Sequence, residues 1–406
     1  MKRFVIIGNG PAANSAAEAI RKQNQAASVV MFSRESHGHY YTPALPELVS
    51  GEKASEKLII HGAQWYARLG IDLRLDCPVQ DADPERRLVI TTEGEEVGYD
   101  ALLLATGGNA FVPPIPGTDD PKVTSGVCTL RTMADAERIK AAAGQGRRVV
   151  LIGGGLLGLE AGNGLRRAGV HVEVVEVFPR LLPRQTDLQG AKLLQVLLED
   201  MGFAFHLGRK TERIARTSDG LEVRLDDGTR LAADMILISA GVRPDLELAG
   251  KLGLTVDKAV LVDDRMRTSL ADVYAAGDVC EHRGRYYGIW PAAMEQGQVA
   301  GTNMAGGAAE YAGTMPTNSL KVVGIALTAF GEIDVEDRHE ALVFQDQAKG
   351  LYRKVVHDQG RMLGGIFLGD EQGARAALAA MRRDRVVSPE IRGLFPAEPE
   401  DWAARR

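Results

Sequence analysis

Two glycine-rich turns, each following a short apolar run, constrain this chain more than any other feature. The first apolar run is Phe4–Ile7, whose length and composition are typical of a buried parallel strand. The chain then passes through Gly8-Asn9-Gly10-Pro11-Ala12-Ala13 into an alanine-rich segment that predicts a helix. Gly8 suits a tight turn, Gly10 lets a phosphate approach the backbone, and Ala13 lets the helix pack closely on the strand. The helix N-terminus would then direct its N–H groups and positive dipole end at that phosphate.

The sequence around the first turn favours a dinucleotide-binding βαβ unit. A helix is predicted over Ala12–Lys22, and a second strand over Ser28–Phe32. Glu35 then lies about where a carboxylate is needed to accept hydrogen bonds from a ribose. Taken by itself, this stretch is also compatible with an ordinary βαβ unit that binds no ligand.

The second turn repeats the pattern in its three-glycine form. The predicted strand Arg148–Ile152 leads into Gly153-Gly154-Gly155-Leu156-Leu157-Gly158, and a helix and a further strand follow at Leu159–Ala168 and His171–Val175. Glu176 comes 176 − 153 = 23 positions after the first glycine, close to the spacing of about 20 expected for a ribose-binding acid. Two such fingerprints, each in its own βαβ frame, are far more specific than one. They predict two dinucleotide-binding domains.

Composition limits the function classes that remain. The chain has 406 residues, enough for two or three domains, and its formal net charge of −6 argues against binding nucleic acid or a membrane surface through bulk charge. No apolar run approaches the length of a membrane span, and no signal peptide is recognised. The cysteines Cys77, Cys128 and Cys280 are far apart and form no Cys-x-x-Cys pair, so we expect no metal site and a reducing, cytoplasmic location.

Several other predicted strands end in small or acidic residues. Ala105-Thr106-Gly107 follows Leu102–Leu104, Gly241 follows Met235–Ser239, and Gly277-Asp278 follows Val273–Ala276. These positions are informative because α/β sheets place ligand contacts at the carboxyl ends of their strands. Pro291 opens a helix predicted to run to about Met304, since proline suits the first helical turn.

The chain changes character from Leu320 onward. Antiparallel strands are predicted at Val322–Leu327, Leu342–Gln345, Leu351–His357 and Met362–Leu368, followed by a helix at Glu371–Arg383. This pattern predicts a separate α+β module. Leu394-Phe395-Pro396 and Trp402 lie in a polar tail with no evident domain of its own, so we expect the tail to dock on a partner. The alternatives are that the tail folds back on its own domain or that the module only mediates homodimerisation.

Taken together, these motifs resemble the two-dinucleotide-binding-domain flavoproteins over nearly the whole chain to about Arg383. Beside the two fingerprints, the resemblance is carried by Ala105-Thr106-Gly107, Leu130-Arg131-Thr132, Gly241-Val242-Arg243-Pro244 and Ala275-Ala276-Gly277-Asp278. It is strongest toward NADH-dependent rubredoxin and ferredoxin reductases and the NADH-binding end of nitrite reductases, through Arg184-Gln185-Thr186-Asp187 and Leu320-Lys321-Val322-Val323-Gly324-Ile325. The chain is also similar to the FAD/NAD subunits of multisubunit iron–sulfur dehydrogenases, such as tungsten aldehyde oxidoreductases and phenylglyoxylate dehydrogenase.

The resemblance implies a fold and a domain order. The fold is α/β with two Rossmann-like, glutathione-reductase-like domains, and the NAD-binding domain is inserted in the FAD-binding domain. The FAD-binding domain is expected at residues 1–112 and 245–319 and the NAD-binding domain at 113–244. The C-terminal α+β interface domain is expected at 320–386 and the tail at 387–406. We expect this module to pack beside the FAD-binding domain and to help form a protein-docking surface.

The resemblance also implies roles for individual residues. Asp278 corresponds to the aspartate that binds the ribityl–pyrophosphate part of FAD, and Glu160 to a glutamate near the flavin and the nicotinamide. The helix after Pro291 would direct its N-terminal dipole at the flavin. No catalytic side chain is assigned, because the flavin is the redox group, and Glu160 has at most a supporting part. The predicted cofactor-binding residues are Gly8, Gly10, Pro11, Ala12, Ala13, Glu35, Thr42, Ala105, Thr106, Gly107, Arg131, Gly153, Gly155, Leu156, Gly158, Glu160, Glu176, Gly241, Gly277, Asp278, Pro291 and Ala292.

Two departures from the family pattern bear on function. Disulfide reductases carry cysteine near residues 42–44, where this chain has Thr42-Pro43-Ala44. Ferredoxin reductases of the oxygenase type place a lysine near Glu47, and that lysine pairs with the glutamate corresponding to Glu160. This chain has an acid there instead.

The leading hypothesis is therefore an FAD-dependent electron-transfer enzyme. It would exchange a hydride with NAD(H) and single electrons with an iron–sulfur protein or partner subunit, as a homodimer or as a subunit of a hetero-oligomer. An NADH oxidase that forms peroxide and a flavin-binding assembly subunit without turnover are the alternatives. Glu176 predicts a preference for NADH over NADPH, and Arg180 and Arg184 are the nearby residues that could instead accept a 2′-phosphate.

Overall fold

The computed structural model describes residues 1–315 and 317–396, which fall into two compact units. Unit 1 comprises residues 1–45, 53–111 and 242–314, and unit 2 comprises residues 46–52, 112–241 and those from 315 onward. Each unit contains a five-stranded parallel sheet, which confirms the predicted α/β class with two Rossmann-like domains. The predicted domain boundaries stay a prediction. Within the described residues, no helix combines the length and apolar character needed to cross a membrane.

The parallel sheet of unit 1 has the strand order β21-β9-β1-β2-β5. Its side chains alternate between two buried faces, as the pleat requires. Phe4 and Ile6 belong to a core cluster that includes the main helices, and Val5 and Ile7 belong to a second cluster on the other face. Burial on both faces explains why these strands are continuous apolar runs in the sequence. The strands are β1 (Arg3–Ile7), β2 (Ser28–Phe32), β5 (Ile71–Arg74), β9 (Ala101–Leu104) and β21 (Val273–Ala275).

Smaller elements cover and connect this sheet. Their strands are β3 (His39–Tyr40), β4 (Ile59–His61), β6 (Val79–Asp83), β7 (Leu88–Thr91), β8 (Glu96–Gly98), β10 (Gly108–Ala110), β19 (Val242–Pro244), β20 (Val260–Val262) and β22 (Cys280–His282). The helical segments are α1 (Pro11–Gln23), η1 (Thr42–Ala44), α2 (Leu45–Val49), η2 (Ser55–Leu58), α3 (Ala63–Arg68), α8 (Glu247–Lys251) and α9 (Trp290–Met304); all but residues 46–49 of α2 belong to unit 1.

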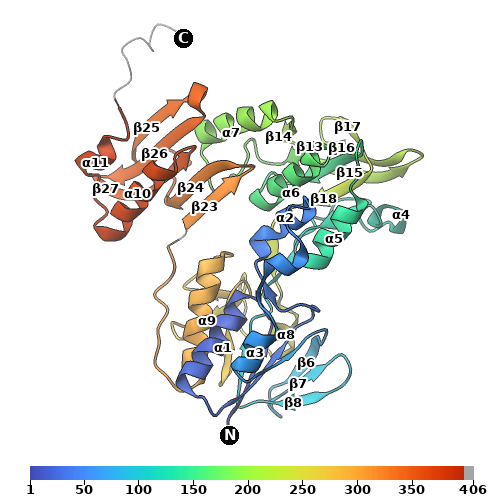
Figure 1. Cartoon of the computed structure of the whole chain (residues 1–406), viewed down its shortest axis with the longest axis vertical. Coiled ribbons are helices and arrows are strands. Elements are labelled where there is room, and N and C mark those ends of the chain that lie inside the picture. The colour runs from blue at the N-terminus through green and yellow to red at the C-terminus, as the bar shows by residue number, and fades with distance from the viewer. Residues whose placement is uncertain (316, 397–406) are drawn as a thin grey trace. The chain divides into compact units, whose positions relative to one another are not determined.

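Helices α1 and α9 lie side by side on one face of the sheet of unit 1 (Figure 1). A Cβ atom placed on Gly297 would lie 2.1 Å from the Ala12 carbonyl oxygen, and one on Gly301 would lie 2.2 Å from the Ala16 carbonyl oxygen. Only glycine permits so close an approach of the two backbones. The contact fixes α9 against the helix that the first fingerprint opens.

Unit 2 repeats the parallel sheet with the strand order β11-β18-β12-β13-β14. Val150, Ile152 and Val175 form a core with the antiparallel strands β15–β17, which cover one face. The elements are α4 (Pro121–Thr124), β11 (Val127–Thr129), α5 (Met133–Ala142), β12 (Arg148–Ile152), α6 (Leu156–Arg167), β13 (His171–Glu176), α7 (Leu188–Asp200), β14 (Ala204–Leu207), β15 (Thr211–Thr217), β16 (Gly220–Leu225), β17 (Arg230–Ala233) and β18 (Met235–Ile238).

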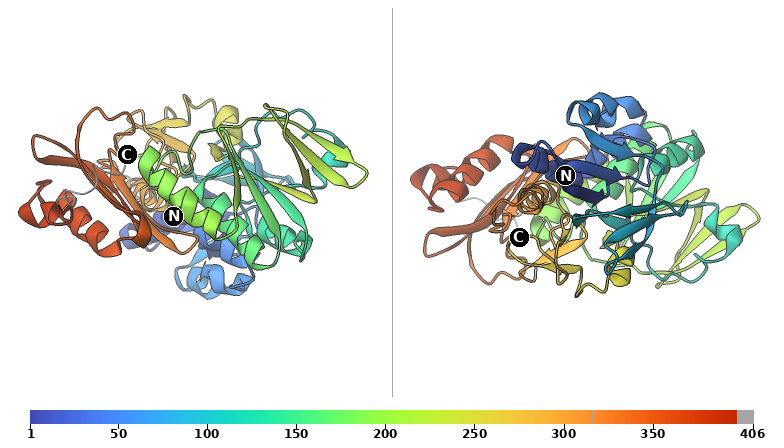
Figure 2. Two further views of the ribbon diagram at one scale, coloured as in Figure 1. Left: turned by 90° about the horizontal axis from the view of Figure 1, so that it is seen from above. Right: turned by 90° about the horizontal axis from the view of Figure 1, so that it is seen from below.

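The C-terminal module is an antiparallel sheet of order β23-β24-β27-β26-β25, with α10 packed on one face (Figures 1 and 2). Its elements are β23 (Thr317–Val322), β24 (Ile325–Gly331), β25 (Glu340–Asp346), η3 (Gln347–Lys349), β26 (Leu351–Asp358), β27 (Arg361–Leu368), α10 (Glu371–Arg383) and α11 (Pro389–Arg392). The predicted single strand Val322–Leu327 is wrong, because a two-residue turn at Val323-Gly324 divides it between β23 and β24. The turn lacks the usual Asn or Asp, so the apolar run concealed it.

The described part of the tail folds back on this module. Val387 and Ile391 are buried in the same cluster as the apolar face of α10, and Leu394 and Phe395 pack against it. The alternative in which the tail folds back on its own domain fits these residues, and docking on a partner stays a prediction. Trp402, the other predicted anchor, lies outside the described residues.

The module also contacts the second Rossmann-like domain within unit 2, and its packing beside the FAD-binding domain stays a prediction. The Tyr352 hydroxyl donates to Asp187 Oδ2 at 2.5 Å, and Lys354 Nζ lies 3.3 Å from the same oxygen. Lys354 is only 2% exposed, so its charge is buried together with that of Asp187. Removing one member of such a pair leaves an uncompensated buried charge, which makes this junction specific.

Candidate dinucleotide sites

The first fingerprint is shaped by a close backbone contact at Gly8. Gly8 has φ +122°, and a Cβ atom there would lie 2.1 Å from the Ala105 carbonyl oxygen at the end of β9. Its N–H donates to the Phe32 carbonyl oxygen at 2.8 Å. The turn is thus held between its two neighbouring strands, and any side chain at Gly8 would break it.

Three predicted segments meet at the start of α1. Gly277, with φ +86°, turns the chain after β21, and a Cβ atom on it would lie 3.1 Å from the Ala12 Cβ and 3.6 Å from the Ala293 Cβ. The Gly277 N–H donates to Oε1 of the buried Gln296 at 2.9 Å. Half-buried Asp278 therefore follows a turn fixed between the first turns of α1 and α9, and Pro291 and Ala292 lie in the first turn of α9.

Glu35 lies three residues beyond the end of β2. Its Oε2 accepts a hydrogen bond from the Tyr40 hydroxyl at 2.7 Å, and its backbone exchanges hydrogen bonds with Ser33 Oγ. Glu35 is half-buried and lies beyond the edge of the sheet at which the parallel strands β1 and β2 both end. This position fits a ribose acceptor, and Tyr40 is a partner that the sequence did not indicate.

The second fingerprint reproduces the first in unit 2. Gly153 has φ +111°, and a Cβ atom there would lie 2.3 Å from the Ser239 carbonyl oxygen beyond β18. A Cβ atom on Gly158 would lie 2.9 Å from the Ser239 Cβ, so the helix α6 packs directly on the end of β18. Gly155 caps α6, which Leu156 begins.

Glu176 is more deeply embedded than the sequence suggested. It is 6% exposed, and its two carboxylate oxygens accept the Gly154 N–H at 2.6 Å and the Phe178 N–H at 2.9 Å. The carboxylate therefore holds the glycine turn and the loop after β13 together. Since each carboxylate oxygen can accept more than one hydrogen bond, a ribose hydroxyl can still be bound.

The loop after Glu176 also uses one of the two nearby arginines. Arg180 donates to the carbonyl oxygens of Thr186 at 3.2 Å and Pro183 at 3.0 Å. Arg184 is exposed. The guanidinium group of Arg180 is therefore engaged in shaping the loop, and Arg184 is the arginine left to meet a 2′-phosphate.

The candidate cofactor helices differ from the other long helices in how their N-termini are capped. Among described helices of ten residues or more, α5, α7 and α10 each begin with a side-chain cap, from Thr132, Asp187 and Asp370. The helices α1, α6 and α9 begin at Gly10, Gly155 and Ile289 without a side-chain hydrogen bond at the cap within the described residues. A bound anion or ring oxygen satisfies such N–H groups. The three helices are those predicted to face the FAD pyrophosphate, the NAD pyrophosphate and the flavin.

Space at the two capping glycines fits a phosphate. Apart from the adjoining residues of the chain, no described atom lies within 4 Å of a Cβ placed on Gly10, and only the Ser239 carbonyl oxygen, at 4.0 Å, approaches one placed on Gly155. These glycines are not required by the packing of the protein, in contrast to Gly8 and Gly153. The residues present therefore fit a dinucleotide at each fingerprint.

The remaining predicted residues lie at turns next to these sites. Thr106 Oγ1 donates to the Asp245 carbonyl oxygen at 3.1 Å, and Gly107 has φ +72° where the chain enters β10. Gly241, with φ +100°, precedes β19. Thr42 is half-buried and begins η1, and Arg131 precedes the cap of α5, its N–H donating to Asp135 Oδ2 at 3.0 Å.

Sequence reasoning missed an aromatic cluster beside the first fingerprint. The His39 ring stacks on Trp290, the first residue of α9, with centroids 5.3 Å apart, and Tyr41 meets the same indole edge-on. His61 stacks on Trp65 at 3.9 Å. The His- and Tyr-rich stretch after Glu35 was the available signal, but nothing in the sequence linked it to Trp290.

A hydrogen-bond network ties this cluster to the fingerprint itself. The Tyr66 hydroxyl contacts Asn9 Oδ1 at 2.8 Å and Asn14 Oδ1 at 2.9 Å, and it accepts the His39 N–H at 3.2 Å. Asn9 lies between the two glycines of the turn. The network therefore ties the turn to α3 and β3.

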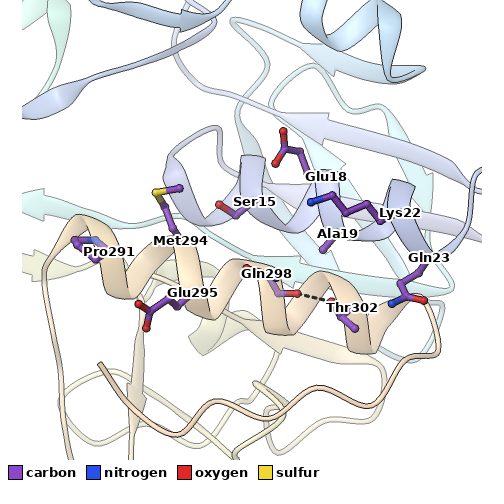
Figure 3. Close-up of a pocket in the computed structure, with 10 residues that line it drawn as sticks. All are labelled: Ser15, Glu18, Ala19, Lys22, Gln23, Pro291, Met294, Glu295, Gln298 and Thr302. Carbon is purple, nitrogen blue, oxygen red and sulfur yellow. Dashed lines mark hydrogen bonds between the residues drawn. The ribbon is translucent and has the colours of Figure 1, made fainter. Parts of the chain in front are cut away.

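A pocket lies between α1 and α9 on unit 1 (Figure 3). The charged side chains Glu18, Lys22 and Glu295 line it beside the exposed Met294. Apart from Pro291 it contains none of the predicted site residues. This pocket is thus a groove between two helices and not the dinucleotide site.

The fold and these two sites define a protein with paired dinucleotide-binding domains. Comparison with known families agrees: residues 2–297 match the pyridine nucleotide-disulphide oxidoreductase family, and residues 316–385 match the rubredoxin NAD+ reductase C-terminal domain. The chain belongs to the pyridine nucleotide-disulphide oxidoreductase family. The predicted family, its oxidoreductase class and FAD and NAD as cofactors are thereby confirmed, whereas the individual site residues stay predictions.

Curated relatives cover nearly all of the chain. It is 32% identical over 409 residues to the assimilatory nitrate reductase electron transfer subunit of Bacillus subtilis (strain 168), a match to 98% of this chain and 52% of that protein. It is 31% identical over 405 residues to the NADH-dependent phenylglyoxylate dehydrogenase subunit epsilon of Aromatoleum evansii, a match to 98% of this chain and 95% of that protein. It is 34% identical over 405 residues to the NADH oxidase of Methanocaldococcus jannaschii, a match to 95% of this chain and 88% of that protein. The chain spans about half the length of the nitrate and nitrite reductase proteins it matches.

The two capping glycines allow a matched test of the sites. Gly10 (φ −82°) and Gly155 (φ −80°) have backbone angles that any residue adopts, so Gly10→Val and Gly155→Val should fold normally. Each valine would occupy the space of a phosphate and remove charge-assisted hydrogen bonds of about 1.5–3 kcal/mol. We expect Gly10→Val to lose FAD and Gly155→Val to keep it while weakening NADH binding roughly ten- to hundredfold. Flavin absorbance and NADH titration measure the two effects, and FAD retention by Gly10→Val would contradict the assignment.

Cofactor preference follows from the loop after β13. We expect the wild type to favour NADH over NADPH in kcat/KM by roughly tenfold or more, because Glu176 repels a 2′-phosphate at close range. Arg180→Ala should destabilise the loop but leave the NADH to NADPH ratio nearly unchanged, since its guanidinium binds loop carbonyls. Arg184→Ala serves as the matched variant. Equal kcat/KM with both cofactors in the wild type would refute the role of Glu176.

The aromatic cluster predicts a loss of stability in acid. His39 is 6% exposed and neither ring nitrogen has a hydrogen-bond partner among the described residues. Burial, assisted by the nearby His61, lowers the pKa of His39 to about 4. In the unfolded chain His39 binds a proton below its ordinary pKa of 6.5, whereas in the folded chain it stays neutral until the pH reaches about 4. The free energy of unfolding therefore falls as the pH drops from about 6.5 to about 4, by up to about 3 kcal/mol.

Urea unfolding monitored by tryptophan fluorescence should show this dependence, because Trp65 and Trp290 lie in the cluster. His39→Phe keeps the ring and removes the titration. We expect the difference in unfolding free energy between the variant and the wild type to grow as pH falls from 7 to 5. A constant difference would show that His39 titrates normally in the folded chain.

Proposed function

We propose that this chain is an FAD-dependent oxidoreductase that exchanges a hydride with NAD(H) and single electrons with an iron–sulfur protein or subunit. When bound, FAD supplies both kinds of transfer, because it accepts electrons in a pair and releases them one at a time. The observation that carries the proposal is the set of uncapped N-termini of α1, α6 and α9 beside two open glycine turns.

The cysteines support an external electron acceptor. Cys77, Cys128 and Cys280 are all free thiols in the described part of the chain. Burial raises the pKa of Cys280 to about 12, and it also raises the pKa values of Cys77 and Cys128. A redox-active cysteine needs an accessible thiolate, so none of the three suits a disulfide relay. Electrons that reach the flavin would have to pass to an acceptor outside the chain.

The names of two relatives support the same proposal. One is an electron transfer subunit of nitrate reductase, and the other is a subunit of an NADH-dependent dehydrogenase. By analogy, we propose that this chain works with a partner protein or subunit that holds an iron–sulfur centre. We also propose a cytoplasmic location, since sparse unpaired cysteines suit a reducing compartment.

In this proposal the protein's own groups bind and orient the reactants. The N-termini of α1 and α6 would bind the two pyrophosphates, Glu35 and Glu176 would accept ribose hydroxyls, and Asp278 would bind the ribityl region of FAD. The N-terminus of α9 would favour negative charge on the reduced flavin ring. Hydride transfer needs alignment and no protein acid or base, so orientation is the main task of these residues.

An NADH oxidase is the second candidate, because a relative with that name is 34% identical and matched over 88% of its length. A peroxide-forming oxidase needs no cysteine, so the cysteine argument does not separate the two functions. A flavin-binding subunit without turnover is the remaining alternative. The choice of electron acceptor separates all three.

The acceptor test uses the purified chain with FAD bound. We expect NADH to bleach the flavin anaerobically, and reduction of a one-electron acceptor such as ferricyanide or an oxidised two-iron ferredoxin to exceed oxygen consumption by roughly tenfold or more. The Gly155→Val variant is the control, because it should retain FAD and lose the NADH-dependent reaction. Oxygen consumption as fast as dye reduction would favour the oxidase, and no bleaching by NADH would favour the subunit without turnover.

A further inference from the structure

The turn between β23 and β24 in the C-terminal module carries an unusual residue. Val323 and Gly324 have φ +55° and +84°, and Val322 pairs with Ile325 across the turn. Two successive left-handed residues make a type I′ hairpin turn, which normally takes Asn-Gly. A β-branched residue in this region is a genuine conformational outlier, and such strain persists only where the surroundings enforce it.

The strained residue contacts the helix of the second fingerprint. The Val323 N–H donates to Glu160 Oε1 at 2.7 Å. Glu160 lies in the second turn of α6, which begins beyond the capping Gly155. Val322 and Val323 are buried and Glu160 is half-buried, so this hydrogen bond is partly shielded from bulk water, which strengthens it.

A second, independent contact holds the module on the same domain. Asp187, the cap of α7, accepts the Tyr352 hydroxyl and lies beside Lys354 Nζ. The turn is thus presented to α6 by a sheet that is anchored elsewhere. The hydrogen bond to Glu160 is therefore part of a fixed junction.

The charged groups that face Glu160 work against its ionisation. Burial is the largest effect and raises the pKa of Glu160, and the carboxylates of Glu47 and Glu52 raise it further. Arg167, the last residue of α6, forms an ion pair with Glu52. The Val323 N–H acts in the opposite direction and lowers the pKa of Glu160.

We propose that Val323 is a positioning residue: its backbone N–H, presented by the C-terminal hairpin, holds the Glu160 carboxylate in one orientation and in its charged form at the NAD(H) site. This rests on the proposed function in taking the second fingerprint as the NAD(H) site. A carboxylate held there favours the positive charge of the oxidised nicotinamide ring. The C-terminal module thereby contributes to the NAD(H) half of the reaction.

The first test measures the hydrogen bond in the wild-type holoprotein. Selective [5-13C]glutamate and 15N-valine labelling follow the Glu160 carboxyl and the Val323 amide by NMR, and the Glu160 signal is assigned by its loss in Glu160→Gln. We expect both signals to shift with the same apparent pKa, and the Val323 amide to stop titrating in Glu160→Gln. A Val323 amide signal that does not shift as Glu160 titrates would overturn the proposal.

The second test separates the N–H from the side chain of Val323. Val323→Asn and Val323→Gly keep the N–H and relieve the left-handed strain, so the pKa of Glu160 and the pH profile of FAD reduction by NADH should stay within a few tenths of a unit of the wild type. Val323→Pro removes the N–H and should raise the pKa of Glu160 by about one unit or more. If the proline variant does not fold, Glu160→Asp, whose carboxylate is too short to reach the turn, replaces it, and the readout is then the pH profile of FAD reduction by NADH, which should shift in the same way.

The outcomes distinguish this proposal from the proposed function. A shifted carboxyl titration with an unchanged pH profile would show that Val323 holds Glu160 but that Glu160 does not serve the reaction, which overturns the positioning role. Val323→Gly behaving like Val323→Pro would assign the effect to side-chain packing and would also overturn it. If NADH reduced the flavin in no variant, including the wild type, the proposed function would fail, and the NMR titration would still decide whether the hydrogen bond exists.

Discussion

Contact between a glycine turn and the end of a neighbouring strand is the constraint on which both sites depend. At Gly8 and at Gly153 the chain turns so close to a carbonyl oxygen, that of Ala105 or Ser239, that a Cβ atom has no room. The turn is consequently held between two parallel strands, and the helix that follows starts in a fixed direction. Because the helix N-terminus inherits that direction, the N–H groups that can bind a phosphate are oriented before any ligand arrives.

The glycines of each fingerprint have two different roles. Gly8 and Gly153 are required by packing, whereas Gly10 and Gly155 have backbone angles open to any residue and are surrounded by space. The first kind makes the fold, and the second kind leaves room for a ligand. The same division appears at the helix caps, since α5, α7 and α10 use side chains and the three candidate cofactor helices do not.

Two residues of the predicted motifs, Glu176 and Thr132, also have a structural role in the folded chain. Glu176 was expected to meet a ribose, and it also joins the glycine turn to the loop after β13 through two backbone N–H groups. Thr132, part of a family motif, caps α5 and forms a reciprocal capping box with Asp135. Loss of such a residue disturbs the shape of the site as well as its contacts. For this reason, a drop in activity on mutation does not by itself identify a ligand contact.

What the sequence determined by itself was local. Glycine spacing, apolar strands and the position of an acid after the second strand were enough to predict two Rossmann-like domains, because each reflects the backbone conformation of a few neighbouring residues. The tertiary structure decided whatever depends on residues far apart in the chain. Val323 meets Glu160 across 163 positions, and Tyr352 meets Asp187 across 165, so nothing local could reveal that the C-terminal module attaches to the second domain. The burial of His39 against Trp290 and the return of the tail to its own core have the same physical origin, since a side chain's environment is set by what packs against it.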